Sequence, residues 1–187
     1  IPANKLRTVH SGIDLKRFDV APLARSEIGI PEGVPLAGNV AALVGHKDHA
    51  TLLDAVPVIL REAPEFRLVI AGEGPLRPHL EAQIARLGIG HAVTLLGQRN
   101  DVPRLLRALD LFIMSSSEEG LGTSVLDAMA SADLAAAVVR ATNDAQLREG
   151  LAGAALALVN HAFSADSMVS GNLAVYEELL SGSTGKK

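Results

Sequence analysis

Two acidic residues bracket a glycine-rich segment in the second half of the chain. Glu119 and Asp127 are eight positions apart, and Gly120 and Gly122 lie between them. Glycine removes the side chain where a backbone must approach another group closely. A helix N-terminus attracts an anion through its free N–H groups and its dipole. This spacing therefore predicts a phosphate-binding loop flanked by two carboxylates, the second of them about one turn inside a helix.

The flanking sequence supplies the elements that would position this loop. An apolar run at residues 110–114 has the composition of a short buried parallel strand. After the loop, Val125, Leu126 and Met129 recur at helical spacing. The segment therefore reads as strand, loop and helix.

The same alternation of short apolar runs and helical patterns continues along the chain. It predicts an α/β fold with a Rossmann-like, doubly wound parallel sheet, helices on both faces and a helical C-terminal section. The expected strands are residues 6–10, 36–43, 67–71, 92–96 and 111–115, and the expected helices are 48–63, 75–87 and 102–109, with consecutive helices over 133–180. Residues 181–187 are expected to be a flexible tail, which leaves 1–180 as the domain.

Composition limits the class of protein. The chain has 187 residues, of which 48% are hydrophobic and 20% charged, enough for a sizeable core in one domain or slightly more. It has no cysteine, which suits a cytoplasmic location, and neither a signal-peptide pattern nor an apolar run of about 20 residues that would span a bilayer. A net charge of −4 without basic clusters argues against a nucleic-acid partner.

Residues 117–130 resemble the E-x7-E loop and helix of the family 4 retaining glycosyltransferases, with Asp127 where that family has Glu. Nearly the whole chain shares the resemblance, because further segments follow in the family's order: 9–14, 43–47, 68–76, 93–102 and 175–180. The resemblance implies the C-terminal, nucleotide-sugar-binding domain of a two-domain GT-B enzyme. The beginning of the chain is accordingly expected to be a cut inside a longer protein.

The implied reaction is transfer of a sugar from a nucleoside diphosphate sugar, such as a UDP or GDP sugar, to an acceptor hydroxyl with retention, as in polysaccharide biosynthesis. No metal and no further cofactor are expected. The acceptor, a sugar, lipid or small molecule, would bind a missing N-terminal domain, so that this fragment alone would be inactive. The longer protein could also contact a membrane peripherally.

The resemblance assigns roles to the loop residues. Glu119 would lie against the donor sugar, and Asp127 would accept hydrogen bonds from the ribose. The diphosphate would be held at the loop and the first helical turn, by Gly120, Leu121, Gly122, Thr123 and Ser124. The alternative is a structural turn in which Thr123 caps the helix and the two carboxylates are solvated.

Other loops contribute residues to the same expected site. Lys47 would meet the charge that develops on the leaving diphosphate, as a second catalytic residue beside Glu119. Gly72 is expected in a strand-to-helix turn facing the donor, and Gln98 and Arg99 at the nucleobase, mostly through backbone groups. The family's usual Arg is replaced by Ala42, which weakens the expected positive charge. The alternative for Lys47 and Arg99 is a solvated surface charge.

Two further expectations concern what the chain lacks. By the family pattern, roughly thirty residues with a buried strand are absent between Ser131 and Ala132, either as an unresolved segment or as a deletion. His46 and His49 have no third ligand at metal-site spacing and are interpreted as loop histidines. Two other functions stay open: a non-catalytic nucleotide or nucleotide-sugar sensor, and a nucleotide-sugar epimerase.

Overall fold

The computed structural model describes residues 6–9, 14–116 and 132–183. The chain forms two compact units, one of residues 20–148 and one that combines residues 1–19 with 149–187.

The 20–148 unit is built on a parallel sheet. Within the described residues the sheet has four strands in the order β3-β2-β1-β4, namely Val93–Gly97, Arg67–Ala71, Leu36–Val40 and Leu111–Phe112. All three strand pairs are parallel, with Gly38 opposite Val69 on one side of β1 and opposite Phe112 on the other. A parallel sheet in this strand order needs a crossover connection between its strands, and the helices provide it.

Helices follow the strands. They are α1 (His49–Glu62), α2 (Arg77–Leu87), α3 (Val102–Ala108) and α5 (Ala132–Asn143), with short 3-10 turns η3 (Arg25–Ile28) and η4 (Gly45–Lys47). Asp48 caps α1 by accepting a hydrogen bond from the Thr51 amide, and Gly88 ends α2 in the left-handed conformation. The predicted end of α2 before Gly88 is confirmed, but the helix begins at Arg77 rather than at Pro75.

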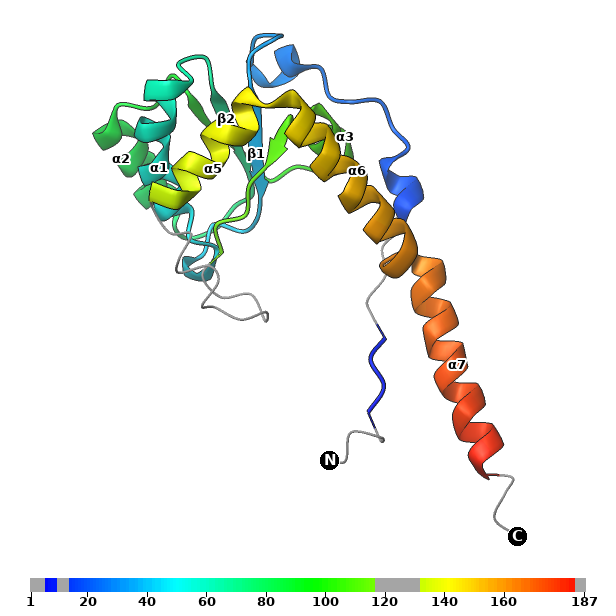
Figure 1. Ribbon diagram of the computed structural model, residues 1–187. Coiled ribbons are helices and arrows are strands. Elements are labelled where there is room, and N and C mark those ends of the chain that lie inside the picture. The colour runs from blue at the N-terminus through cyan, green and yellow to red at the C-terminus, as the bar shows by residue number, and fades with distance from the viewer. Residues whose placement is uncertain (1–5, 10–13, 117–131, 184–187) are drawn as a thin grey trace. The chain divides into compact units, whose positions relative to one another are not determined.

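Alternate residues of β2 point into two separate apolar layers. Leu68 and Ile70 belong to a cluster with side chains of α1, α2 and α5, whereas Val69 and Ala71 belong to a cluster with η3 and α3. Figure 1 shows α1, α2 and α5 on one side of the sheet and α3 on the other. The predicted α/β fold with helices on both faces is confirmed.

Three strand predictions differ from the structure. Residues 6–9 contain no strand, so the prediction of a strand at 6–10 is wrong, and the described sheet has four strands rather than five. The strand predicted at 36–43 ends at Val40, and the one predicted at 111–115 ends at Phe112. The sequence is apolar beyond both strand ends because residues that follow the strands are also buried: Leu43 is 0% exposed and Ile113 is 5% exposed. An apolar run therefore did not mark where either strand ends.

The second unit combines the two ends of the chain. Its elements are η2 (Leu15–Phe18), most of α6 (Ala145–Ala162) and α7 (Ala165–Ser183). Arg7 forms an ion pair with Glu178 of α7. The prediction of consecutive C-terminal helices is confirmed. No helix in the described parts of the chain is long and apolar enough to cross a membrane.

Candidate functional site

A cavity of about 340 Å³ lies at the carboxyl ends of three strands. In open α/β sheets this is the edge at which ligands bind. The loops after β1, β2 and β3 and the start of α3 line it: Val40, Ala41, Ala42, Ala71, Gly72, Glu73, Gln98, Arg99 and Val102. The structure thus brings together three of the predicted site residues, Gly72, Gln98 and Arg99.

The loops after β1 and β2 run unusually close together. The Ala41 amide donates to the Ala71 carbonyl at 3.1 Å, and the Leu43 amide donates to the Glu73 carbonyl at 3.0 Å. A Cβ atom at Gly72 would lie 1.9 Å from the carbonyl oxygen of Ala41, where no side chain fits. Gly72 is therefore required by backbone packing, and its contact with a ligand stays a prediction.

The guanidinium of Arg99 is engaged inside its own loop. Its Nε donates to one carboxylate oxygen of Asp101 at 2.8 Å and its Nη2 to the other at 2.7 Å. This hydrogen-bonded pair raises the pKa of Arg99 and lowers the pKa of Asp101. The arrangement fits the expectation that this loop acts mainly through backbone groups rather than through the arginine charge.

Glu73 is the acidic side chain of the cavity wall. Its carboxylate accepts a hydrogen bond from Arg77 Nη1 at 2.7 Å, and Arg77 Nε also donates to Glu81 at 2.9 Å. A Cβ atom at Gly97 would lie 2.9 Å from Glu73 Oε1. The charged side chains of this wall are thus paired with neighbours, and most of the other lining residues are small or apolar, with Gln98 the uncharged polar one.

Lys47 ends the η4 turn and is half-buried. Its amide donates to the Val44 carbonyl at 3.1 Å, and its carbonyl accepts from the hydroxyl of Ser115 at 2.9 Å. Lys47 is not among the residues that line the cavity. The structure therefore fixes the backbone of this loop against the segment after β4, and a phosphate role for the Lys47 amine stays a prediction.

The predicted phosphate loop lies outside the described residues. This applies to Glu119, Gly120, Leu121, Gly122, Thr123, Ser124 and Asp127, and also to the junction after Ser131. Their assigned roles, and the expected missing segment, stay predictions.

Sequence reasoning missed a buried polar pair beside the predicted site. His49 and Asn39 are each 2% exposed, and His49 Nε2 lies 3.0 Å from Asn39 Oδ1. The interpretation of His49 as a loop histidine is wrong, because it is the first residue of α1 and is buried. An Asn inside the apolar strand 36–40 was the available signal, since a buried amide needs a polar partner.

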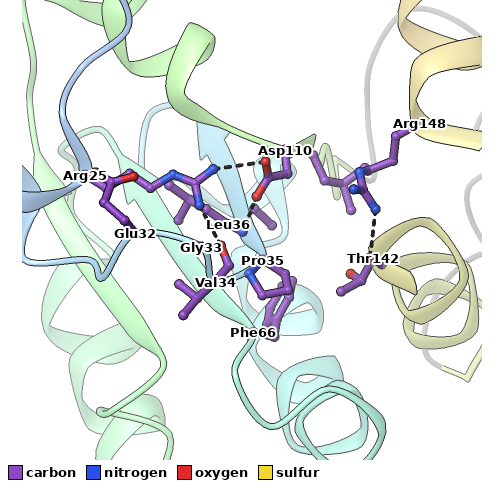
Figure 2. A pocket seen from close by; sticks show the side chains of 12 residues that line it. Arg25, Glu32, Gly33, Val34, Pro35, Leu36, Phe66, Asp110, Thr142 and Arg148 are labelled. Atoms are coloured by element: carbon purple, nitrogen blue, oxygen red, sulfur yellow. Dashed lines mark hydrogen bonds and ion pairs between the residues drawn. The ribbon is translucent and has the colours of Figure 1, made fainter. Parts of the chain in front are cut away.

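A second cavity lies at the opposite, amino ends of the strands (Figure 2) and has a volume of about 350 Å³. Arg25 donates there to the carbonyls of Val34 and Ala108 and forms an ion pair with Asp110. Asp110 also accepts from the Leu36 amide at 2.8 Å. These charges hold the protein's own backbone, so the geometry does not favour this cavity as the nucleotide site.

Comparison with known proteins decides the family. The profile of the glycosyl transferases group 1 matches residues 21–156, well over half of the chain. The chain belongs to this family. The predicted resemblance is confirmed at that level, and the residues that line the cavity at the carboxyl ends of β1, β2 and β3 all lie within the matched region.

Individual relatives agree with this assignment. EpsF of Bacillus subtilis, whose name describes it as a glycosyltransferase, is 30% identical over 131 residues, which cover 68% of this chain and 34% of EpsF. The 2-deoxystreptamine glucosyltransferase of Streptomyces kanamyceticus is 29% identical over 128 residues, covering 65% of this chain and 33% of that enzyme. The chain thus spans about a third of the length of these curated relatives.

The solved structures show the same fold. HepE of Anabaena in complex with UDP has a TM-score of 0.76 and 21% identity, covering 96% of this chain and 58% of HepE. HepE has also been solved in complex with UDP-glucose. This level of identity establishes the shared fold, and the ligands named are those of HepE.

Proposed function

We propose that this group 1 glycosyltransferase chain binds the nucleoside diphosphate sugar donor at the carboxyl edge of its sheet and belongs to a retaining enzyme. The cavity formed by the loops after β1, β2 and β3 is the observation that carries the proposal. Its walls combine small residues with close backbone approach, which suits a flat base and sugar. The family membership and the UDP complexes of a protein with the same fold support it.

Each loop is proposed to bind a different part of the donor. Backbone groups around Gln98 and Arg99 would meet the base, because the Arg99 guanidinium is already engaged by Asp101. Lys47 and the amides of residues 120–124 would bind the diphosphate. Asp127 would bind the ribose, and Glu119 would contact the donor sugar. The bond between the anomeric carbon and the diphosphate oxygen breaks, a bond from that carbon to the acceptor oxygen forms, and the proton of the acceptor hydroxyl passes to the departing diphosphate. Positive charge near the diphosphate stabilises the departing group, with no metal required.

Calorimetry of the full chain with UDP, GDP and ADP tests the donor-binding proposal. We expect one of the three diphosphates to bind with an affinity at least about tenfold above the others, which corresponds to about 1.4 kcal/mol. Gly122→Val should abolish binding of that diphosphate while leaving its nucleoside bound. Absence of binding by all three would contradict the proposal.

Retention needs a separate experiment. A longer protein that contains this chain and transfers sugar should give a product with the anomeric configuration of the donor, read by NMR before mutarotation. An inverted product would contradict the proposed stereochemistry while leaving donor binding intact.

A nucleotide sensor is the second candidate, and Ala42 favours it. Ala42 lines the cavity. The family that the sequence resembles has an Arg at this position, so this part of the cavity wall lacks that positive charge. Lower positive charge would weaken stabilisation of a leaving diphosphate more than it weakens binding of the base. Diphosphate binding without any transfer in the longer protein would support the sensor.

A further inference from the structure

A chain of buried hydrogen bonds joins three segments beside the proposed donor site. Asn39 near the end of β1 donates from Nδ2 to the carbonyl of Ile113 at 2.8 Å. Its oxygen lies 3.0 Å from Nε2 of His49, the first residue of α1. The chain therefore connects the strand β1, the segment after β4 and the start of α1.

The direction of these bonds determines the tautomer of His49. The Asn39 amide nitrogen faces a carbonyl, so its oxygen must be the atom that faces the imidazole. A carbonyl oxygen only accepts, and Nε2 of His49 must therefore carry the hydrogen. In the neutral ring Nδ1 is then an acceptor, and it is buried without a partner among the described residues.

A second connection runs parallel to the first. The hydroxyl of Ser115 donates to the Lys47 carbonyl at 2.9 Å, two residues before His49. The Ile113 amide also donates to the Gly38 carbonyl at 2.9 Å. Residues 113–116 are thus hydrogen-bonded both to the loop that contains Lys47 and to β1. The next residue, Ser117, begins the predicted phosphate loop.

The cost of this arrangement argues for a role in geometry. Burying the imidazole leaves its Nδ1 acceptor without a partner among the described residues, which costs the hydration of that atom. Apolar side chains of similar size would avoid that loss, so the buried pair is a poor source of stability. Directional hydrogen bonds do fix the distance and orientation between β1, the start of α1 and the segment after β4. Apolar contacts alone would allow these segments to shift relative to one another.

We propose that His49, through Asn39, is a positioning residue that sets the Lys47 loop against the segment entering the phosphate loop, and thereby aligns the two groups that bind the donor diphosphate. The inference rests on the proposed donor-binding function. His49 touches neither donor nor acceptor in this account. Its loss should therefore affect the phosphates more than the nucleoside.

Three substitutions separate positioning from packing. His49→Phe keeps an aromatic ring and removes the donor. His49→Gln places an amide N–H where Nε2 lies, whereas His49→Asn places its amide near the position of Nδ1. All three are made in the full chain, and affinities for UDP and uridine are measured by NMR titration, which also detects weak binding.

We expect His49→Phe and His49→Asn to weaken UDP binding about tenfold, the loss of part of one charge-assisted contact, and to change uridine binding less than about twofold. His49→Gln should restore UDP affinity. Equal losses for UDP and uridine, or UDP binding at the native level in all three variants, would overturn the proposal.

Amide hydrogen exchange without nucleotide distinguishes this failure from failure of the proposed function. His49→Phe should speed exchange at residues 44–48 and 113–116 while β2 stays protected, and His49→Gln should restore protection. Uniformly faster exchange would overturn the positioning role. If the variants show these local changes but the chain with native His49 does not bind UDP, the result would instead contradict UDP as the donor and, with it, the functional part of the inference.

Discussion

Two cavities of the 20–148 unit lie at opposite ends of one sheet and have nearly equal volumes, about 340 Å³ at the carboxyl end and about 350 Å³ at the amino end. They differ in what their charged side chains bind. At the amino end Arg25 and Arg148 donate to backbone carbonyls in and next to the walls, those of Val34, Ala108, Ala141 and Thr142. At the carboxyl end Arg99 pairs with Asp101, and most of the other lining residues are alanine, glycine or valine.

This difference teaches that cavity size does not identify the ligand site. At the amino-end cavity, arginine side chains hydrogen-bond backbone carbonyls of loops and helix ends and so stabilise the fold. The carboxyl-end cavity leaves the backbone of three loops accessible, as a binding site for a base, sugar and diphosphate requires. Substitutions at the two ends should therefore separate stability from nucleotide binding.

The glycines of the two cavities give the largest expected contrast. Gly72→Ala would place a methyl group 1.9 Å from the Ala41 carbonyl oxygen, whereas a Cβ atom at Gly33 of the amino-end cavity meets nothing within 4 Å. We expect Gly72→Ala to lower the free energy of unfolding by about 3 kcal/mol or more. Gly33→Ala should cost only about 1 to 2 kcal/mol, from its left-handed conformation. Urea denaturation measures both, and equal costs would show that the loops do not approach as described.

The two arginines sharpen the contrast next. Arg25→Met removes the donor to two carbonyls and to Asp110, and its side chain is only 14% exposed. We expect it to lower the free energy of unfolding by about 1 to 2 kcal/mol and to leave UDP affinity unchanged.

Arg99→Met is the matched variant at the carboxyl end. It breaks an ion pair of partly exposed groups, and should cost less than about 1 kcal/mol of stability. Its UDP affinity should also change little, because the Arg99 guanidinium already donates two hydrogen bonds to Asp101. Loss of UDP binding in Arg25→Met alone, without unfolding, would place the nucleotide at the wrong end for this account.

Adding charge to the carboxyl-end cavity should strengthen it as an anion site. Ala42→Arg places a cation on its wall, and we expect UDP to bind about 3- to 10-fold more tightly at low salt, less so at high salt. Ala42→Gln adds comparable length without charge and serves as the control. An equal gain in both variants would indicate packing rather than phosphate attraction.

The smallest expected effect is a pH dependence at the carboxyl end. Burial lowers the pKa of His49, with an opposing contribution from Asp48 and a further lowering by Lys47. The unfolded state binds a proton more readily than the folded state, so His49 contributes to a loss of stability as pH falls below about 6.5. Urea denaturation should show a smaller loss between neutral and acid pH in His49→Gln, and parallel curves for the two proteins would contradict the buried neutral histidine.

The sequence predicted the elements whose signals are local. The apolar run at 67–71 and the helix closed by Gly88 appear where expected, because β-strand composition and a left-handed cap depend on neighbouring residues alone. The strand expected at 6–10 failed because a short segment with only two aliphatic residues becomes a strand only when a partner strand is available.

The site was predictable in part for the same reason. Gly72, Gln98 and Arg99 were expected together because the carboxyl ends of parallel strands share one edge, and they do line one cavity. The partnership of Asn39 with His49, and of Arg99 with Asp101, depends on side-chain direction after folding. No spacing in the chain reveals which nitrogen faces which oxygen.

Hydrogen exchange of the full chain with and without UDP tests the central claim most directly, since it reports which end of the sheet the nucleotide covers. We predict slower exchange on UDP addition at residues 40–47, 71–74 and 97–102, which contain the carboxyl ends of β1, β2 and β3 and the Lys47 loop. Protection confined to residues 32–37 and 108–111, around the amino-end cavity, would contradict the account.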